Sequence, residues 1–94
     1  MDNIREPIKK MEILSINIKE KNQIVVRAIT NNDLIEFEFR MTYRPELKVT
    51  QIERSQNFIN LARYNSAFEK AVHDLVKKVY DGERLDFPIK INFE

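Results

Sequence analysis

His73 is the only histidine in the sequence and the first residue to consider for chemistry. On a helix, Glu69 would lie one turn before it, so the two side chains could supply two ligands to a metal ion. A catalytic metal site needs about three protein ligands, and this spacing provides two. A single histidine also gives little basis for a Ser-His-Asp arrangement. We therefore interpret His73 as a residue at the solvent boundary of a helix, and we predict no metal site, no cofactor and no catalytic residue.

Glu36 and Glu38 are the one pair of carboxylates whose spacing could suit general acid–base chemistry. On a strand they would share a face and lie about 7 Å apart. Such a pair needs a cleft, and the outer face of a regular strand does not provide one. Ion pairing with Arg27 or Arg40 on a neighbouring strand is a simpler role. We therefore predict that the protein is not an enzyme.

The composition limits the remaining classes of function. The 94 residues suit a single domain, 1–94, without cysteine for disulfides or thiolate chemistry and with one glycine, too few for a phosphate-binding loop. The longest aliphatic run, Ile24-Val25-Val26, is too short to span a membrane, so we expect a cytoplasmic protein without a membrane partner. Nearly a third of the residues are Ile, Asn or Lys, which have AT-rich codons and favour a bacterial or phage gene.

The net charge of +1 indicates no strong preference for nucleic acid, but the charges are unevenly distributed. Phosphate attraction by a basic segment at 40–63 makes nucleic-acid binding the alternative function. Tyr43 and Tyr64 lie in or beside this segment, yet the apolar pattern assigns both to the core. The candidate nucleic-acid contacts are Arg40, Arg44, Lys48, Arg54 and Arg63.

Alternating apolar and polar residues predict two strands in the first third of the chain. The first covers about 12–19, and its apolar face consists of Leu14, Ile16 and Ile18. The second covers about 23–30. The sequence Asn31-Asn32-Asp33 then predicts a tight turn, because Asn and Asp tolerate positive φ.

A third strand has the clearest alternation, with apolar side chains at every second position from Ile35 to Tyr43. Pro45 is expected to end this strand, and a weaker strand is expected at 47–52. The tail at 85–94 alternates in the same way and predicts a strand with one buried face. Pro88 lies inside that tail and favours an edge position, since proline has no amide donor.

Between these strands, the apolar period changes to that of a helix over about 56–80. The sequence Ser66-Ala67-Phe68-Glu69 fits a capping box, so either two helices at 56–64 and 67–80 or one kinked helix is expected. Gly82 stands where a helix end favours positive φ. The predicted fold is α+β: an antiparallel β-meander of three to five strands, with one long kinked helix or two consecutive C-terminal helices packed on one face and a final edge strand, in the order β-β-β-(β)-α-(α)-β.

The second face of the predicted meander carries the remaining functional signal. A small antiparallel sheet is usually covered on one face and polar on the other, but here aliphatic side chains stand among the charges. The N-terminal Ile4 and Ile8 could cover this face, as could a second copy of the chain or another protein. Isolated exposed aliphatics are the simplest alternative. We predict an interaction or regulatory accessory module, a homodimer in its leading form, with a candidate interface of Val25, Arg27, Ile29 and Leu34.

Overall fold

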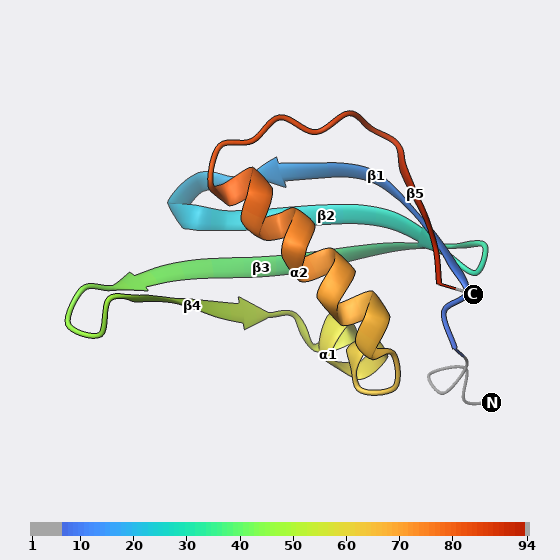
Figure 1. The fold of residues 1–94 in the computed structure, drawn as a ribbon, viewed down its shortest axis with the longest axis horizontal. Coiled ribbons are helices and arrows are strands. Elements are labelled where there is room, and N and C mark those ends of the chain that lie inside the picture. The colour runs from blue at the N-terminus through green and yellow to red at the C-terminus, as the bar shows by residue number, and fades with distance from the viewer. Residues whose placement is uncertain (1–6, 94) are drawn as a thin grey trace.

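A computed structural model describes residues 7–93, which form one antiparallel sheet with two helices on one of its faces (Figure 1). The five strands lie in the order β4-β3-β2-β1-β5, so the first four strands follow the chain and β5 returns beside β1. The predicted α+β meander with helices and a final edge strand is confirmed. The elements are β1 (Lys10–Ile18), the 3₁₀ turn η2 (Glu20–Asn22), β2 (Gln23–Thr30), β3 (Asp33–Arg44), β4 (Val49–Arg54), α1 (Gln56–Ala62), α2 (Ser66–Tyr80) and β5 (Ile89–Asn92).

β1 contains a β-bulge that the sequence analysis missed. Its register against β2 shifts between Ile13 and Ser15, which leaves Leu14 as the extra residue. The bulge lets Ile13 and Ile16 both face the core, although they are an odd number of residues apart. The prediction that Leu14, Ile16 and Ile18 share a buried face is therefore wrong: Leu14 is half-buried and Ile18 is 52% exposed.

The core lies between the sheet and the helices and is built around phenylalanine rings. Phe37 on β3 meets the rings of Phe58 on α1 and Phe68 on α2 edge to face, at centroid distances of 5.3 and 5.7 Å. Phe39, two residues further along β3, contacts Phe58 in the same way at 4.9 Å. The period-2 alternation of β3 thus anchors both helices to the middle of the sheet. Ile24, Val26 and Ala28 on β2 extend this buried layer.

The helical region consists of two helices. Asn65 is the residue before α2, with φ −140° and ψ 76°, and its side chain does not cap that helix. The side-chain amide instead donates to the Leu61 carbonyl at 2.8 Å, while Oδ1 accepts from the Ile8 amide at 2.9 Å. Because the helix begins at Ser66, the predicted capping box, in which Ser66 would precede the helix, is wrong.

α2 ends in a Schellman motif centred on Gly82. The Gly82 amide donates to the Val79 carbonyl and the Glu83 amide to the Lys78 carbonyl, at 3.0 and 2.9 Å. Gly82 has φ +92°, a left-handed conformation that glycine adopts without steric cost. The role predicted for this glycine is confirmed.

The last two strands, β4 and β5, differ from their predicted bounds. β4 begins at Val49 because residues 45–48 form the hairpin turn, in which Lys48 has φ 55°. β5 covers four residues and starts after Pro88, so the predicted strand at 85–94 is too long within the described residues. Both strands are edges of the sheet. No helix among residues 7–93 is long and apolar enough to cross a membrane.

Candidate functional site

The predicted interface residues lie together on the outer face of the sheet, the face opposite the helices. Ile29 on β2 pairs directly with Leu34 on β3, and one step along the same strands Arg27 pairs with Glu36. Leu34 is 60% exposed, and Ile29 is half-buried, as is the neighbouring Val25. Apolar and charged side chains are thus mixed on the outer face of β2 and β3.

The N-terminal segment does not cover this face with Ile8. That side chain is 5% exposed and belongs to the core cluster on the helix side of the sheet. Its amide also bonds to Asn65, which lies between the two helices. Ile4, the other residue proposed to fold back, lies outside the described residues.

Glu36 and Glu38 project from the outer face of β3 without a cleft around them. The Glu36 side chain is 61% exposed and lies 3.7 Å from the Arg27 guanidinium, between Oε2 and Nε. Glu38 accepts a hydrogen bond from the Gln23 side-chain amide. This cross-strand pairing is the arrangement expected for structural carboxylates.

His73 is more enclosed than a boundary residue, because its ring lies against two core aromatics. The ring stacks on Phe58 and meets Phe39 edge to face at a centroid distance of 6.0 Å. Its Nε2 is shielded from solvent and has no hydrogen-bond partner among the described residues. Glu69, the possible second metal ligand, forms an ion pair with Arg54. Within residues 7–93, no group of three or more His, Cys, Asp and Glu side chains could hold a metal ion.

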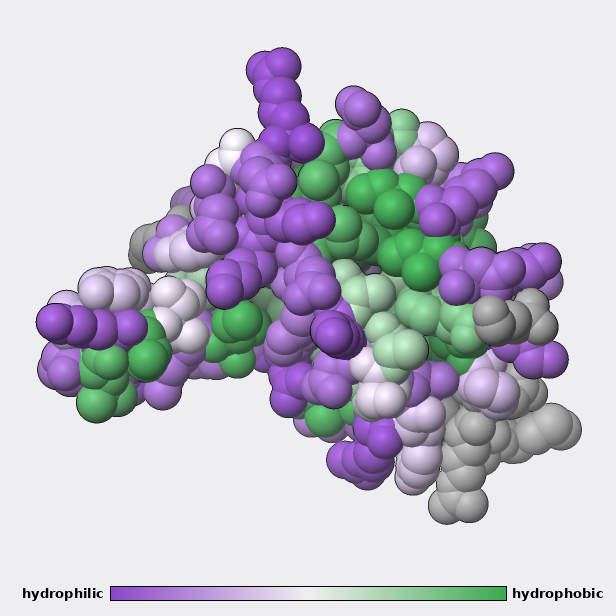
Figure 2. Space-filling model, viewed as in Figure 1, coloured by the Kyte–Doolittle hydropathy of each residue, from purple (hydrophilic) through white to green (hydrophobic). Residues whose placement is uncertain are grey.

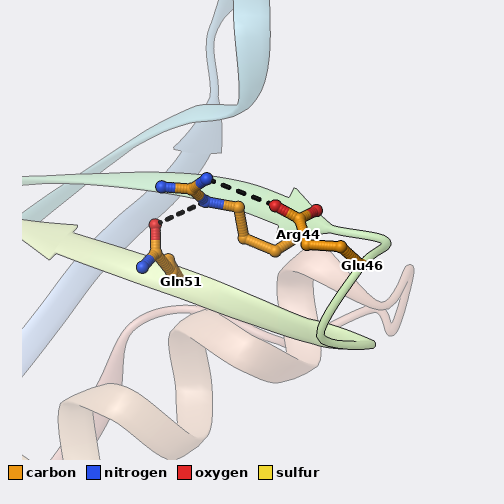
Figure 3. Close-up of polar contacts among 3 residues, drawn as sticks. All are labelled: Arg44, Glu46 and Gln51. Carbon is orange, nitrogen blue, oxygen red and sulfur yellow. Dashed lines mark hydrogen bonds and ion pairs between the residues drawn. The ribbon is translucent and has the colours of Figure 1, made fainter.

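The cations of the 40–63 segment do not form one surface. Arg44 is held within its own hairpin (Figure 3): Nε donates to Gln51 Oε1 at 3.0 Å, and Nη1 lies 3.5 Å from Glu46 Oε2. Arg54 shares the helix-side face with Phe39, its partner on β3. Arg44 thus forms an ion pair with Glu46, and Arg54 forms one with Glu69.

The other three predicted cations are distributed over the length of the molecule. Arg40 lies on the outer face opposite Glu53. Lys48 stands in the turn between β3 and β4, whereas Arg63 follows α1 at the other end of β4 (Figure 1). A continuous track for a phosphate backbone is not formed by these residues.

The end of the β3–β4 hairpin carries exposed apolar side chains, among them Tyr43, which the sequence analysis assigned to the core. Tyr43 is 55% exposed, Leu47 63% and Val49 47%. The hairpin projects beyond the helices (Figure 1), and its end shows apolar side chains beside hydrophilic ones at the left of the helix-side view (Figure 2). Tyr64, the second tyrosine predicted to be buried, is 49% exposed in the connection between the helices. Sequence periodicity identifies the apolar face of a strand but not where the covering helix stops.

A depression of about 770 Å³ adjoins the other end of the outer face and was also missed. It lies where β1, β5 and the β2–β3 turn meet, and Ile29 contributes to it. Its charged lining side chains among the described residues are Lys9, Lys10, Lys90 and Glu12. Neither His73 nor Glu36 lines it. Lys90 is distant in sequence from Lys9 and Lys10, so only the pairing of β1 with β5 reveals the cluster.

The fold and its surface define a small α+β protein with one helix-covered sheet face and one open face of mixed charge and apolar character. No protein-family model and no curated protein sequence matches this chain.

Proposed function

We propose that this protein is a non-catalytic interaction module that uses the outer face of its sheet to bind a second copy of itself. The observation that carries the proposal is the Ile29–Leu34 pair: two aliphatic side chains directly opposite each other, one 60% exposed, on the face opposite both helices. The pair lies one position from the β2–β3 turn, and such adjacent aliphatics mark an interaction surface more strongly than scattered ones.

The charges on the outer face favour a second copy over a strongly charged partner. In a two-fold symmetric interface the same patch meets itself, so a patch of one sign repels its mate. Here the outer face carries both signs, with Glu12 beside Ile29 on one row and Arg27 beside Glu36 on the next. Such a face can match positive to negative when it meets its own copy.

The size of the face predicts a weak dimer. Five strands about 4.8 Å apart and about eight residues long present about 600 Å² per copy. Stable interfaces bury about 800 Å² per partner. We therefore expect an equilibrium between monomer and dimer in the micromolar range rather than an obligate dimer. The role that fits is that of an accessory or regulatory protein, which we place in the cytoplasm of a bacterial or phage-infected cell.

Solution mass as a function of protein concentration tests the proposal, by light scattering or sedimentation. The wild-type mass should rise toward that of a dimer, and Leu34→Lys should abolish the rise because it places a like charge on each copy. Ile18→Lys is the matched control, since Ile18 is comparably exposed but lies on the helix-side face. A monomeric wild-type protein up to high micromolar concentration would refute the proposal.

A second candidate function, nucleic-acid binding, has one observation in its favour. Tyr43 is exposed at the β3–β4 hairpin, whose turn also carries Lys48, and an exposed aromatic ring can stack on an unpaired base. Retention of labelled single-stranded oligonucleotides at about 50 mM salt tests it, because phosphate contacts are strongest at low salt. Loss of retention in Tyr43→Ala and Lys48→Gln, but not in Arg63→Gln, would support the hairpin as the contact. Absence of retention by the wild type would exclude it.

A further inference from the structure

Each side of the outer face carries both signs: Glu12 stands beside Lys90 on the β1–β5 side, and Arg40 follows Glu38 on β3. Lys10 and Lys90 belong to the depression at the β1–β5 side, with Lys9 beside them. Glu36 and Glu38 stand on β3, across β2 from that depression. Lys10 and Glu38 thus carry opposite charges on the two strands that flank β2.

We propose that the second copy docks about a two-fold axis that passes over Leu34, with the partner's Glu38 at Lys10 on the rim of the depression. This inference rests on the proposed function and names the geometry of that same interface.

The axis follows from the register of the strands. With strands about 4.8 Å apart and a rise of about 3.3 Å per residue, Lys10 and Glu38 are separated by about 10 Å across the sheet and about 20 Å along it. A two-fold axis in the plane of the interface exchanges these two positions only if it is the perpendicular bisector of the line that joins them. That bisector crosses β2 between Arg27 and Ile29 and passes close to Leu34 on β3.

Two further pairings follow from the same axis without adjustment. Leu34 meets its own symmetry mate, so the most exposed aliphatic side chain of the outer face's central strands becomes the centre of the contact. Arg27 faces the partner's Glu12, which pairs opposite charges a second time. One operation thus matches two ion pairs and an apolar pair, each ion pair occurring twice by symmetry.

Charge exchange tests the Lys10–Glu38 pairing. Lys10→Glu and Glu38→Lys should each raise the dissociation constant of the dimer about ten-fold. In both symmetry-related contacts, the reversed charge would face a like charge of the partner. The double variant should return to within about three-fold of the wild type, since the pairs are restored with opposite polarity. Lys70→Glu, on the exposed side of α2, should leave the constant unchanged.

Crosslinking tests the position of the axis independently. The chain has no cysteine, so Leu34→Cys introduces a single thiol per copy. A bis-maleimide reagent with a reach of about 10 Å, the spacing of stacked sheets, should join two such copies efficiently. Leu47→Cys, at the far hairpin, should remain uncrosslinked. A wild-type protein that is always monomeric overturns the proposed function itself. A dimer whose double variant is not restored, or whose Leu34→Cys copies do not crosslink, overturns only this axis.

Discussion

The imidazole ring of His73 stacks on the ring of Phe58, with the centroids 5.7 Å apart and the planes inclined by 25°. Burial against the aromatic core lowers the pKa of His73 from its ordinary value of 6.5, and the Arg54 cation lowers it further. The carboxylates of Glu69 and Asp74 act in the opposite direction without reversing the shift. The fold therefore holds this histidine in its neutral form.

The stability of the fold should consequently fall on mild acidification. The unfolded chain takes up a proton at His73 near pH 6.5, whereas the folded chain does so only at lower pH. The stabilisation is complete above about pH 6.5 and is lost as the pH falls through the lowered pKa. Urea unfolding at about pH 7.5 and about pH 5.5 measures the effect on the free energy of unfolding. His73→Phe keeps an aromatic ring without a titrating group, so its free energy should change less; an equal change would contradict the assignment to His73.

Removal of the Arg54 cation should raise the pKa of His73. In Arg54→Met, the guanidinium no longer opposes protonation, and Glu69 loses its ion-pair partner and attracts the imidazolium more strongly. Titration of the His73 ring protons by NMR measures the pKa directly, because no other histidine overlaps with it. Arg63→Met serves as the control at an exposed position after α1 and should leave the pKa unchanged.

Truncation of Phe58 should lower the free energy of unfolding more than truncation of an exposed aromatic residue does. Its ring contacts Phe37, Phe39 and Phe68, so Phe58→Ala leaves a cavity where the helices meet the sheet. We expect a loss of about 3–5 kcal/mol in the free energy of unfolding. Tyr64→Ala, at a half-exposed ring, should change it by less than about 0.5 kcal/mol. Denaturant unfolding distinguishes the two; similar losses would mean that Phe58 is not central to the core.

Asn65 should stabilise the fold because its side chain forms hydrogen bonds to both the N-terminal segment and the end of α1. Asn65→Ala removes both the acceptor for the Ile8 amide and the donor to the Leu61 carbonyl. The expected loss is about 1–2 kcal/mol, since each part-buried hydrogen bond contributes about 1 kcal/mol. Asn65→Asp keeps the acceptor and places a negative charge at the start of α2, so its loss should be smaller. Thermal unfolding of the three proteins provides the ranking, and equal losses in both variants would argue against the Ile8 bond.

The sequence predicts those parts of the fold in which the residue pattern is compatible with only one assignment of side chains to the core. The alternation from Ile35 to Met41 is unambiguous, and β3 buries the side chains it indicates. β1 has two competing alternations, because Ile13 and Leu14 are adjacent and both aliphatic. Only the pairing with β2 decides between them, and it does so by a bulge.

The candidate site divides in the same way. The outer-face position of Val25, Arg27, Ile29 and Leu34 follows from period-2 alternation and could be predicted. The basic depression could not, because it depends on β5 returning to β1 and bringing Lys90 beside Lys10. The exposure of Tyr43 depends on where the helices cross the sheet, a tertiary property absent from the strand alone (Figure 1).

The bulge at Leu14 gives β1 an unusual tolerance to a change in chain length. Loss of one residue from a regular strand turns every following side chain to the opposite face. Here, removal of Leu14 would make Ile13 and Ile16 two positions apart, so that a regular alternation would bury both. Deletion of Leu14 would therefore keep the same side chains of β1 facing the core. It would remove the additional twist that the bulge gives the strand.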